Sequence, residues 1–493
     1  MNTRINWKTD KIIFLILLGV VFLSHFPFLD TDPDRNMSIG RGPFTDEGLN
    51  TIQVRNWVNQ GTLNLSECDN LLKTPLLGFP LALTYKLFGT SHAVSRLHVT
   101  VLVFLMLLLI GWNRKNTGWI IVFLLITMLQ YQIFQSSHFS MAEMLSVAAI
   151  LAAIDMFSRS SDPEYTQKSR DKQSFLAAVF LSFSYFFKIQ FIYIIVLIPF
   201  VLIIRWFTTH YFARKHIVRQ GFIITGTLLL FLLIYLLGWY LPNRQAYDFI
   251  MANQSGELSL SGKTWEYVKF NLSYHFFQGW LQWFLYFFIL LLFTGFYLLN
   301  ITKSKRYTVL FLSSFMWFLI ELHKLTMVYL PTRYQVSFLA SMGLLMSLVL
   351  FELISVKKQR QSMIFRPLAV LSILVLLCIN IFIYKDSLQH RNYVIRDTNL
   401  YLSKYINKND VVLGAWAPSL TWKSGSKALP VWNHFLNYRD AVNQFNPSVI
   451  IAESDEQDSE QAWKSQGINL SLISDSTKSV RIGNWDLIVY WLP

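Results

Sequence analysis

Charged residues are scarce in this sequence of 493 residues, since Asp, Glu, Lys and Arg make up only 15% of it. An average soluble domain contains roughly 25%. Hydrophobic residues make up 53% of the chain and aromatic residues 16%, and many of them lie in long uncharged runs. This composition excludes an ordinary soluble protein and predicts a mostly α-helical, polytopic membrane protein.

Cysteine is rare in the sequence, and a cleavage motif for a signal peptide is missing. The chain has only two cysteines, Cys68 in a predicted outer loop and Cys378 in an apolar run, so we expect no disulfide between them. The first apolar run ends near Leu29, and no small-x-small cleavage motif follows it. The basic N-terminus and this run are therefore expected to form an uncleaved membrane anchor.

Acidic residues are too few to balance the basic ones, and the net charge is +14. The basic residues occur in short clusters between apolar runs, which is typical of cytoplasmic loops and needs no polyanionic partner. We therefore predict no nucleic-acid partner. The clusters are Arg114-Lys115; Arg159 with Lys168, Arg170 and Lys172; Arg214-Lys215 with Arg219; Lys303, Lys305 and Arg306; and Lys357, Lys358 and Arg360.

The apolar runs fix the number of predicted membrane helices, because about 20 apolar residues cross a bilayer as a helix. About eleven spans are expected, near residues 12–29, 95–113, 118–135, 141–157, 174–187, 190–206, 220–241, 277–299, 307–323, 333–354 and 364–384. With a cytoplasmic N-terminus, alternation places every basic cluster in the cytoplasm and the C-terminus outside. Two outer loops are long, 30–94 and 242–276.

The C-terminal tail differs from the rest of the chain. Segments 395–407, 434–445 and 456–466 have helical patterns, and "DVVLGAW" (410–416), "PSVIIAE" (447–453), "INLSLIS" and "WDLIVYWL" have strand patterns. Short apolar strands that alternate with polar helices predict a small α/β domain. We therefore divide the chain into a transmembrane domain, 1–385, and a soluble extracytoplasmic domain, 386–493.

The first outer loop contains most of the unusual polar residues. Its segment "GPFTDEGLNTIQVRNWVNQGTLN" (42–64) begins with an acidic pair and continues as an imperfect amphipathic helix. A second short helix is expected from Pro75 onward. Two such helices lying at the interface would hold Asp46, Glu47, Lys73 and Arg96 near the membrane boundary.

These segments resemble the GT-C superfamily of membrane glycosyltransferases, and most closely the protein O-mannosyltransferases and lipid A aminoarabinose transferases. The resemblance covers nearly the whole chain and rests on short motifs in the same order. They are "DEGLNTIQVRNWVNQGTL", "LKTPLLGFPLALTYKLFG" and "SRL" in the first outer loop, "SSHFSMAEMLSVAAILAAIDMF" with Glu143, "YFFKIQF" with Lys188, and "YLPTRYQ" with Arg333-Tyr334. The soluble α/β tail is also similar to this branch.

The resemblance implies transfer of a sugar from a polyprenyl-phosphate donor by a single displacement with inversion. Because an acceptor hydroxyl is a poor nucleophile, such a reaction needs a general base. We predict that Asp46 is this base and that Glu47 shapes its environment or contacts a sugar hydroxyl. The alternative is that the acidic pair only stabilises the start of a helix.

The leaving phosphate needs cationic and hydrogen-bonding partners. Lys73, Arg96, Lys188, Arg333 and Tyr334 are the candidates, and snorkelling of basic side chains to the interface is the alternative for the lysines and arginines. Lys188 stands out because it interrupts more than 30 mostly apolar residues.

Glu143 and His138 are candidate ligands of the acceptor or the sugar, with simple exposure of the Glu143 charge at the interface as the alternative. Two such residues are too few for a metal site, which needs three or four convergent ligands. We therefore expect no essential metal and no other cofactor.

The sequence also departs from the family pattern. Lys73-Thr74-Pro75 lacks one proline of the Lys-Pro-Pro segment, Leu72 precedes the lysine where aminoarabinose transferases often have Glu, and position 49 is Leu where some members have Arg. These departures bear on the identity of the donor sugar more than on the type of reaction.

We predict from these features a monomeric, multi-pass inner-membrane glycosyltransferase of lipopolysaccharide or other cell-envelope glycan synthesis. Its active site would face the periplasm, and its acceptor would be a lipid or a glycan. The alternatives are a flippase or transporter of lipid-linked glycans and a surface-polysaccharide polymerase or ligase. Transporters usually place polar groups at mid-membrane in broken helices, whereas these charges cluster at the outer ends of spans.

Overall fold

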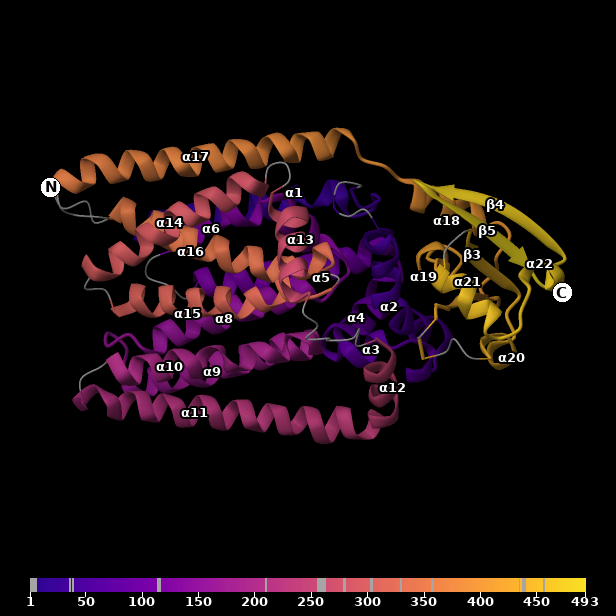
Figure 1. The fold of residues 1–493 in the computed structure, drawn as a ribbon, viewed down its shortest axis with the longest axis horizontal. Helices are drawn as coiled ribbons and strands as arrows, with labels where there is room; N and C mark the ends of the chain where they lie inside the picture. Colours follow the sequence, from indigo (N-terminus) through magenta and orange to yellow (C-terminus); the bar gives the residue numbers. More distant parts are fainter. Residues whose placement is uncertain are drawn as a thin grey trace.

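The computed structural model describes residues 7–34, 37, 40–112, 117–208, 211–254, 263–277, 281–301, 305–328, 330–355, 359–433, 435–436, 440–454 and 457–493. A bundle of long helices makes up most of the molecule, and a small sheet domain covers one end of it (Figure 1). The C-terminus lies in the sheet domain, and the first described helix runs along the bundle (Figure 1).

Every predicted membrane span coincides with a helix or a pair of helices in the described residues. These are α1 (Trp7–Ser24), α5 (His92–Trp112), α6 (Gly118–Phe123) with α7 (Tyr131–His138), α8 (Glu143–Ser160), α9 (Gln167–Phe187), η5 (Ile189–Val196) with α10 (Leu197–Thr208), α11 (Tyr211–Tyr235), α14 (Leu281–Ile301), α15 (Lys305–Glu321), α16 (Val336–Ser355) and α17 (Gln359–Gln389).

Eight helical segments of the described chain are long and apolar enough to cross a membrane. The stretch from α6 through η4 (Leu124–Met128) to α7 would be a ninth span, bent by 91°. The bend follows from Gln130, which leaves the helical backbone conformation and caps α7 by accepting a hydrogen bond from the backbone N–H of Ile133. Helices α8 and α9 also belong to the bundle but carry three or more charged residues each.

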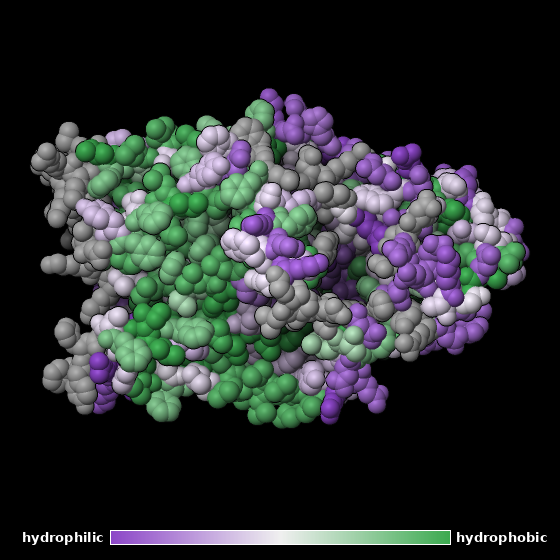
Figure 2. Space-filling model, in the orientation of Figure 1, coloured by the Kyte–Doolittle hydropathy of each residue, from purple (hydrophilic) through white to green (hydrophobic). Residues whose placement is uncertain are grey.

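The core of the bundle is formed by α8 and α16. Every residue of α8 is buried, and so is every residue of α16 from Val336 to Leu350. The alanine-rich segment of α8, from Ala148 to Ala153, allows its neighbours to approach closely, as small residues do between membrane helices. The outer surface is apolar, with Phe222 and Phe293 more than 70% exposed. Figure 2 shows this apolar surface over the bundle and a polar surface over the sheet domain.

The first outer loop folds as α2 (Gly42–Gln60), η3 (Leu65–Glu67), α3 (Asn70–Lys73) and α4 (Pro75–Phe88). Helix α4 fits the expectation of an interfacial helix, because Leu83, Leu87 and Phe88 are 61–72% exposed beside the bundle. Helix α2 is covered on more sides than a helix lying on the membrane would be: nearly all its residues from Phe44 to Asn56 are buried. The second long loop contains η7 (Leu241–Asn243), α12 (Arg244–Gln254) and α13 (Thr264–Phe276).

The tail contains a five-stranded sheet in the order β2-β1-β3-β5-β4. Strand β1 (Val411–Leu413) pairs in parallel with β2 (Lys427–Leu429) and β3 (Val449–Glu453), whereas β5 (Trp485–Trp491) pairs antiparallel with β3 and with β4 (Ser476–Ile482). The helices of the domain are α18 (Val394–Leu402), α19 (Ala417–Leu420), α20 (Ala441–Phe445), α21 (Gln457–Lys464) and α22 (Leu470–Ile473).

Two details of the predicted tail are wrong. The segment "INLSLIS" is not a strand, because the side chain of Asn469 accepts a hydrogen bond from the N–H of Ser471 and starts the short helix α22. The strand there is β4, which was missed because it is an exposed edge strand without an apolar face. The predicted helix 434–445 is helical only at α20, and residues 434 and 437–439 lie outside the described residues.

Candidate active site

Side chains from four distant parts of the chain meet at the end of the bundle that contacts the sheet domain. Asp46 comes from the second turn of α2, Glu143 from the start of α8, Lys188 from the residue after α9, and Arg333 from η9 (Thr332–Gln335). The sequence predicted all four as site residues, and the fold places them in one cluster, which we call the Asp46–Lys188 cluster.

The Asp46–Lys188 cluster is a chain of ion pairs. An Nη1 atom of Arg333 is paired with Oδ2 of Asp46, and Nε of Arg333 lies 3.5 Å from Oε1 of Glu143. The Nζ atom of Lys188 is paired with the same Glu143 oxygen. Arg333 is therefore shared between two carboxylates, and a competing anion can draw it away from either.

Tyr334 forms one wall of this cluster. The Lys188 ammonium lies 4.9 Å from the centre of the Tyr334 ring, and Gln190 donates a hydrogen bond of 3.1 Å to the phenol oxygen. The backbone of η9 is fixed as well, because Nζ of Lys324 donates a 2.8 Å hydrogen bond to the carbonyl of Tyr334. The positions of Arg333 and Tyr334 are therefore set by packed neighbours.

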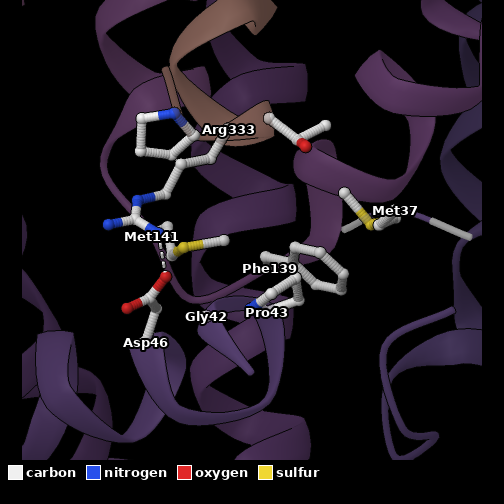
Figure 3. Close-up of a pocket in the computed structure, with 9 residues that line it drawn as sticks. Met37, Gly42, Pro43, Asp46, Phe139, Met141 and Arg333 are labelled. Carbon is white, nitrogen blue, oxygen red and sulfur yellow. Dashed lines mark hydrogen bonds and ion pairs between the residues drawn. The ribbon is translucent and has the colours of Figure 1, made fainter. Parts of the chain in front are cut away.

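A small pocket opens beside the Asp46–Arg333 pair (Figure 3). It encloses about 320 Å³ including its open mouth, which is at the lower end of the range for ligand pockets. Its other side chains are mostly apolar: Met37, Pro43, Phe139, Met141, Pro331 and Thr332.

Gly42 leaves the space in which the ion pair forms. A Cβ atom at this position would lie 3.1 Å from Oδ2 of Asp46 and 3.2 Å from Nη1 of Arg333. A larger residue would therefore crowd the contact between the carboxylate and the guanidinium.

The environment of Asp46 favours its protonated form. Asp46 is only 8% exposed, and burial raises the pKa of its carboxyl group; Arg333 opposes this rise, and the negative charge of Glu143 adds to it. A carboxylate with a raised pKa is a better proton acceptor than an ordinary aspartate. The site therefore supplies a buried carboxylate beside cationic groups at the edge of a pocket.

Glu47 belongs to a different cluster, although it is adjacent in sequence. It accepts hydrogen bonds from Nε of Arg96 at 2.9 Å, from the N–H of Ser140 at 2.7 Å and from His92 at 3.1 Å. Burial opposes its ionisation, but Arg96 and then His92 outweigh this effect and lower the pKa of Glu47. Glu47 does not line the pocket, so the geometry favours a structural role over contact with a sugar.

Arg96, His138 and Lys73, three other predicted site residues, do not line the pocket. Arg96 is fully buried and donates to Glu47 and to the carbonyls of Phe28 and Thr31, so its predicted contact with a phosphate has no support in this arrangement. His138 is buried, with its Nδ1 atom 3.1 Å from that of His25. Lys73 pairs with Asp69 at 2.7 Å.

Sequence reasoning missed the apolar wall of the pocket. Phe139 and Met141 lie inside the motif "SSHFSMAEM", and Pro331 and Thr332 lie inside "YLPTRYQ". Their position next to the predicted polar site residues of these motifs was the signal that could have identified them. Met37, from the loop before α2, had no such signal. The two cysteines are unpaired, as expected. Within the described residues, no group of three His, Cys, Asp or Glu side chains is placed to hold a metal ion.

Comparisons with known proteins identify the fold. No protein-family model and no curated protein sequence matches the chain. Solved structures do match. ArnT from Cupriavidus metallidurans in the apo state has a TM-score of 0.62 at 12% identity, covering 96% of this chain and 97% of that one. The same protein bound to undecaprenyl phosphate has a TM-score of 0.60 at 14% identity, with the same coverage.

The structure of a second protein, AglB, also matches this chain. The archaeal oligosaccharyltransferase AglB from Archaeoglobus fulgidus, in complex with an inhibitory peptide and a dolichol-phosphate, has a TM-score of 0.57 at 10% identity. The match covers 89% of this chain and 69% of that one. ArnT and AglB both have the GT-C fold, and the chain described here therefore has it too, as the sequence resemblance implied.

Proposed function

We propose that this GT-C-fold protein is a membrane glycosyltransferase that moves a sugar from a polyprenyl-phosphate donor to a lipid or glycan acceptor. The observation that carries the proposal is the Asp46–Lys188 cluster, in which a buried carboxylate with a raised pKa lies beside Arg333 and Lys188 at the edge of a pocket. A base and a cationic phosphate site are the two parts that such a transfer needs.

Each group has a defined part in the proposed single displacement. Asp46 accepts the proton of the acceptor hydroxyl while its oxygen forms a bond to the anomeric carbon. The bond from that carbon to the phosphate oxygen breaks, and the electron pair leaves with the polyprenyl phosphate. Arg333 and Lys188 bind the phosphate, and the attack from the opposite side inverts the anomeric centre. Binding of the phosphate to Arg333 also frees Asp46 from its ion pair.

Lipid carriers support this choice of donor. One ArnT structure has undecaprenyl phosphate bound, and the AglB structure has a dolichol-phosphate. A polyprenyl donor also suits a site at the end of a helix bundle whose surface is apolar, because the prenyl chain then stays in the bilayer while the phosphate reaches the cations (Figure 2).

We also propose that the site faces the periplasm from the inner membrane, with the N-terminus in the cytoplasm. Helix α8 starts at Glu143 in the cluster and ends at Ser160, and its 18 residues span about 27 Å. Arg159 is therefore near the opposite end of the bundle, where the positive-inside rule places the cytoplasm. Arg170 in the first turn of α9 and Arg219, which pairs with Asp171, lie at the same end.

The proposed function is tested in a strain that lacks the gene. Mass spectrometry of its lipid and glycan pools should show one polyprenyl-phosphate sugar accumulating and one lipid or glycan losing that sugar. Purified protein in vesicles should then restore the transfer from that donor. Movement of a lipid-linked glycan across the vesicle membrane without any transfer would instead favour a transporter.

Removal of either cation is expected to weaken binding of the lipid phosphate. In Lys188→Ala and in Arg333→Ala, affinity for undecaprenyl phosphate should fall about 10- to 100-fold, because hydrogen bonds to charged groups contribute about 1.5–3 kcal/mol. Native mass spectrometry of the purified protein measures this change. Lys86→Ala, an exposed lysine of α4, is the matched control and should bind normally. Unchanged affinity in both variants would exclude Lys188 and Arg333 as the groups that bind the phosphate.

The pH dependence of transfer should reflect the environment of Asp46. Only ionised Asp46 accepts a proton, so kcat/KM should fall as the pH decreases through its pKa, which lies above the ordinary 3.8. Because Glu143 raises this pKa, the acid limb should move to lower pH in Glu143→Gln. Transfer rates measured from about pH 4 to about pH 8, a range that starts near the ordinary aspartate pKa, test this expectation. An acid limb that stays in place in Glu143→Gln would show that the two carboxylates are not coupled.

A further inference from the structure

Helix α2 is held between the bundle on one side and the sheet domain on the other (Figure 1). Successive residues of an α-helix are about 100° apart, so positions 46 and 48 point in nearly opposite directions. Asp46 meets Arg333 of the bundle, and Gly48 meets Pro418 and Ser419 of the sheet domain. A displacement of α2 from the sheet side therefore moves the carboxylate on the bundle side.

We propose that the C-terminal sheet domain is a positioning element for the proposed catalytic helix, and that the contact between Gly48 and Ser419 sets the depth of Asp46 in the site. The inference rests on the proposed function and adds a role for the tail, which the sequence left open. Gly48 and Ser419 are positioning residues in this scheme, because neither lines the pocket.

The contact between Gly48 and α19 is closer than any side chain would allow. A Cβ atom on Gly48 would lie 2.6 Å from Oγ of Ser419, 2.7 Å from the backbone C of Pro418 and 2.8 Å from the backbone N of Ser419. Two of these three atoms belong to the backbone, which has no rotamer to change. An added methyl group must therefore push α2 and α19 apart.

Ser419 also bonds directly to the first turn of α2. Its hydroxyl lies 3.0 Å from the carbonyl oxygen of Phe44 and 3.4 Å from that of Thr45, the residue before Asp46. Carbonyls in a first turn normally accept only helix hydrogen bonds, so this additional donor ties the segment that carries Asp46 to the tail.

A second set of contacts holds the rest of α2. Arg55 donates a 2.8 Å hydrogen bond to Thr421 and stacks on Trp422, with its guanidinium 4.3 Å from the ring centre. Asn56 exchanges hydrogen bonds with the backbone of Ala428 in β2, donating at 2.8 Å and accepting at 3.3 Å. These contacts fix the direction of the helix as well as its depth.

The two parts also share one hydrophobic core. Phe44, Leu49 and Ile52 of α2 are buried in the same cluster as Val412, Trp416 and Leu420 of the tail. Separation of the domain would expose these side chains to water, which opposes movement of the tail. The sheet domain is therefore a fixed support for α2 and not a lid.

Gly48→Ala in the full-length protein tests the inference. We expect kcat for transfer to fall about 100-fold, since a 1 Å misplacement of a reacting group has that effect, while KM for the donor changes little because Arg333 and Lys188 are untouched. Ser419→Ala, which removes the bonds to the first turn, should lower kcat less. Gly226→Ala in α11, where a Cβ meets nothing within 4 Å, is the matched control and should keep the wild-type kcat.

Hydrogen exchange supplies a second readout that needs no substrate. Backbone amides of residues 42–56 should exchange faster in Gly48→Ala and Ser419→Ala than in the wild-type protein and in Gly226→Ala. Wild-type kcat in Gly48→Ala, or unchanged exchange in this segment, would overturn the inference. Faster exchange in a protein that transfers no sugar from any polyprenyl phosphate would support the positioning role and refute the proposed function.

Discussion

Asp46→Asn is expected to lower the rate of sugar transfer by about 10²- to 10⁴-fold, the range that a general base contributes. The asparagine amide has nearly the same shape and can still accept a hydrogen bond from Arg333, but it does not take a proton. Folding should not suffer, because burial of Asp46 disfavours its charged form and a neutral side chain avoids that cost. The measurement is single-turnover release of undecaprenyl phosphate from the donor, with protein levels determined in parallel.

Asp248→Asn is the matched control for this change, since it removes an exposed carboxylate of α12 that pairs with Arg244 in the same helix. It should transfer at the wild-type rate. Full transfer by Asp46→Asn at normal protein levels would exclude Asp46 as the base and leave it the structural role of pairing with Arg333.

Glu47→Gln is expected to destabilise the protein by about 3–5 kcal/mol, the usual effect of removing one partner of a buried ion pair. Arg96 is fully buried, and Glu47 is the carboxylate with which it forms an ion pair. A glutamine would remove the ion-pair partner of this buried guanidinium and leave it only the longer-range attraction of Asp32. Thermal unfolding of the purified protein in detergent measures the effect, and a low yield of folded protein would agree with it.

The same pair predicts how stability depends on pH. The pKa of Glu47 is lower in the folded protein than in the unfolded chain. Its contribution to stability is therefore complete above the ordinary glutamate pKa, about 4.3, and is lost as the pH falls below that value. Glu460→Gln, which removes an exposed partner of Lys464, is the control and should unfold as the wild type does. Identical unfolding of Glu47→Gln and Glu460→Gln would contradict a structural role for Glu47.

Adjacent carboxylates are thus expected to give opposite phenotypes. Asp46→Asn should be folded and inactive, whereas Glu47→Gln should be unstable. The difference comes from their neighbours: Asp46 shares Arg333 with Glu143, whereas Glu47 forms its ion pair with the fully buried Arg96. The sequence "TDEGL" does not distinguish the roles of the two residues, because it contains no information about which cation each carboxylate contacts.

The sequence by itself determined the features that depend on short segments. Runs of apolar residues fixed the positions of the membrane helices, and alternating patterns fixed strands β3 and β5 of the tail. The short motifs around Asp46, Glu143, Lys188 and Arg333 were enough to include these four residues among the predicted site residues. Local patterns are readable because helices and strands repeat every few residues.

Only the tertiary structure decided which of these residues act together. Asp46 and Arg333 are 287 positions apart, and Ser419 and Phe44 are 375 positions apart. Periodicity over ten or twenty residues carries no information about pairs at such separations. For this reason the sequence assigned Glu47, Arg96 and His138 to the site, and only the folded chain paired Glu47 with Arg96 and His138 with His25, and brought the tail against α2.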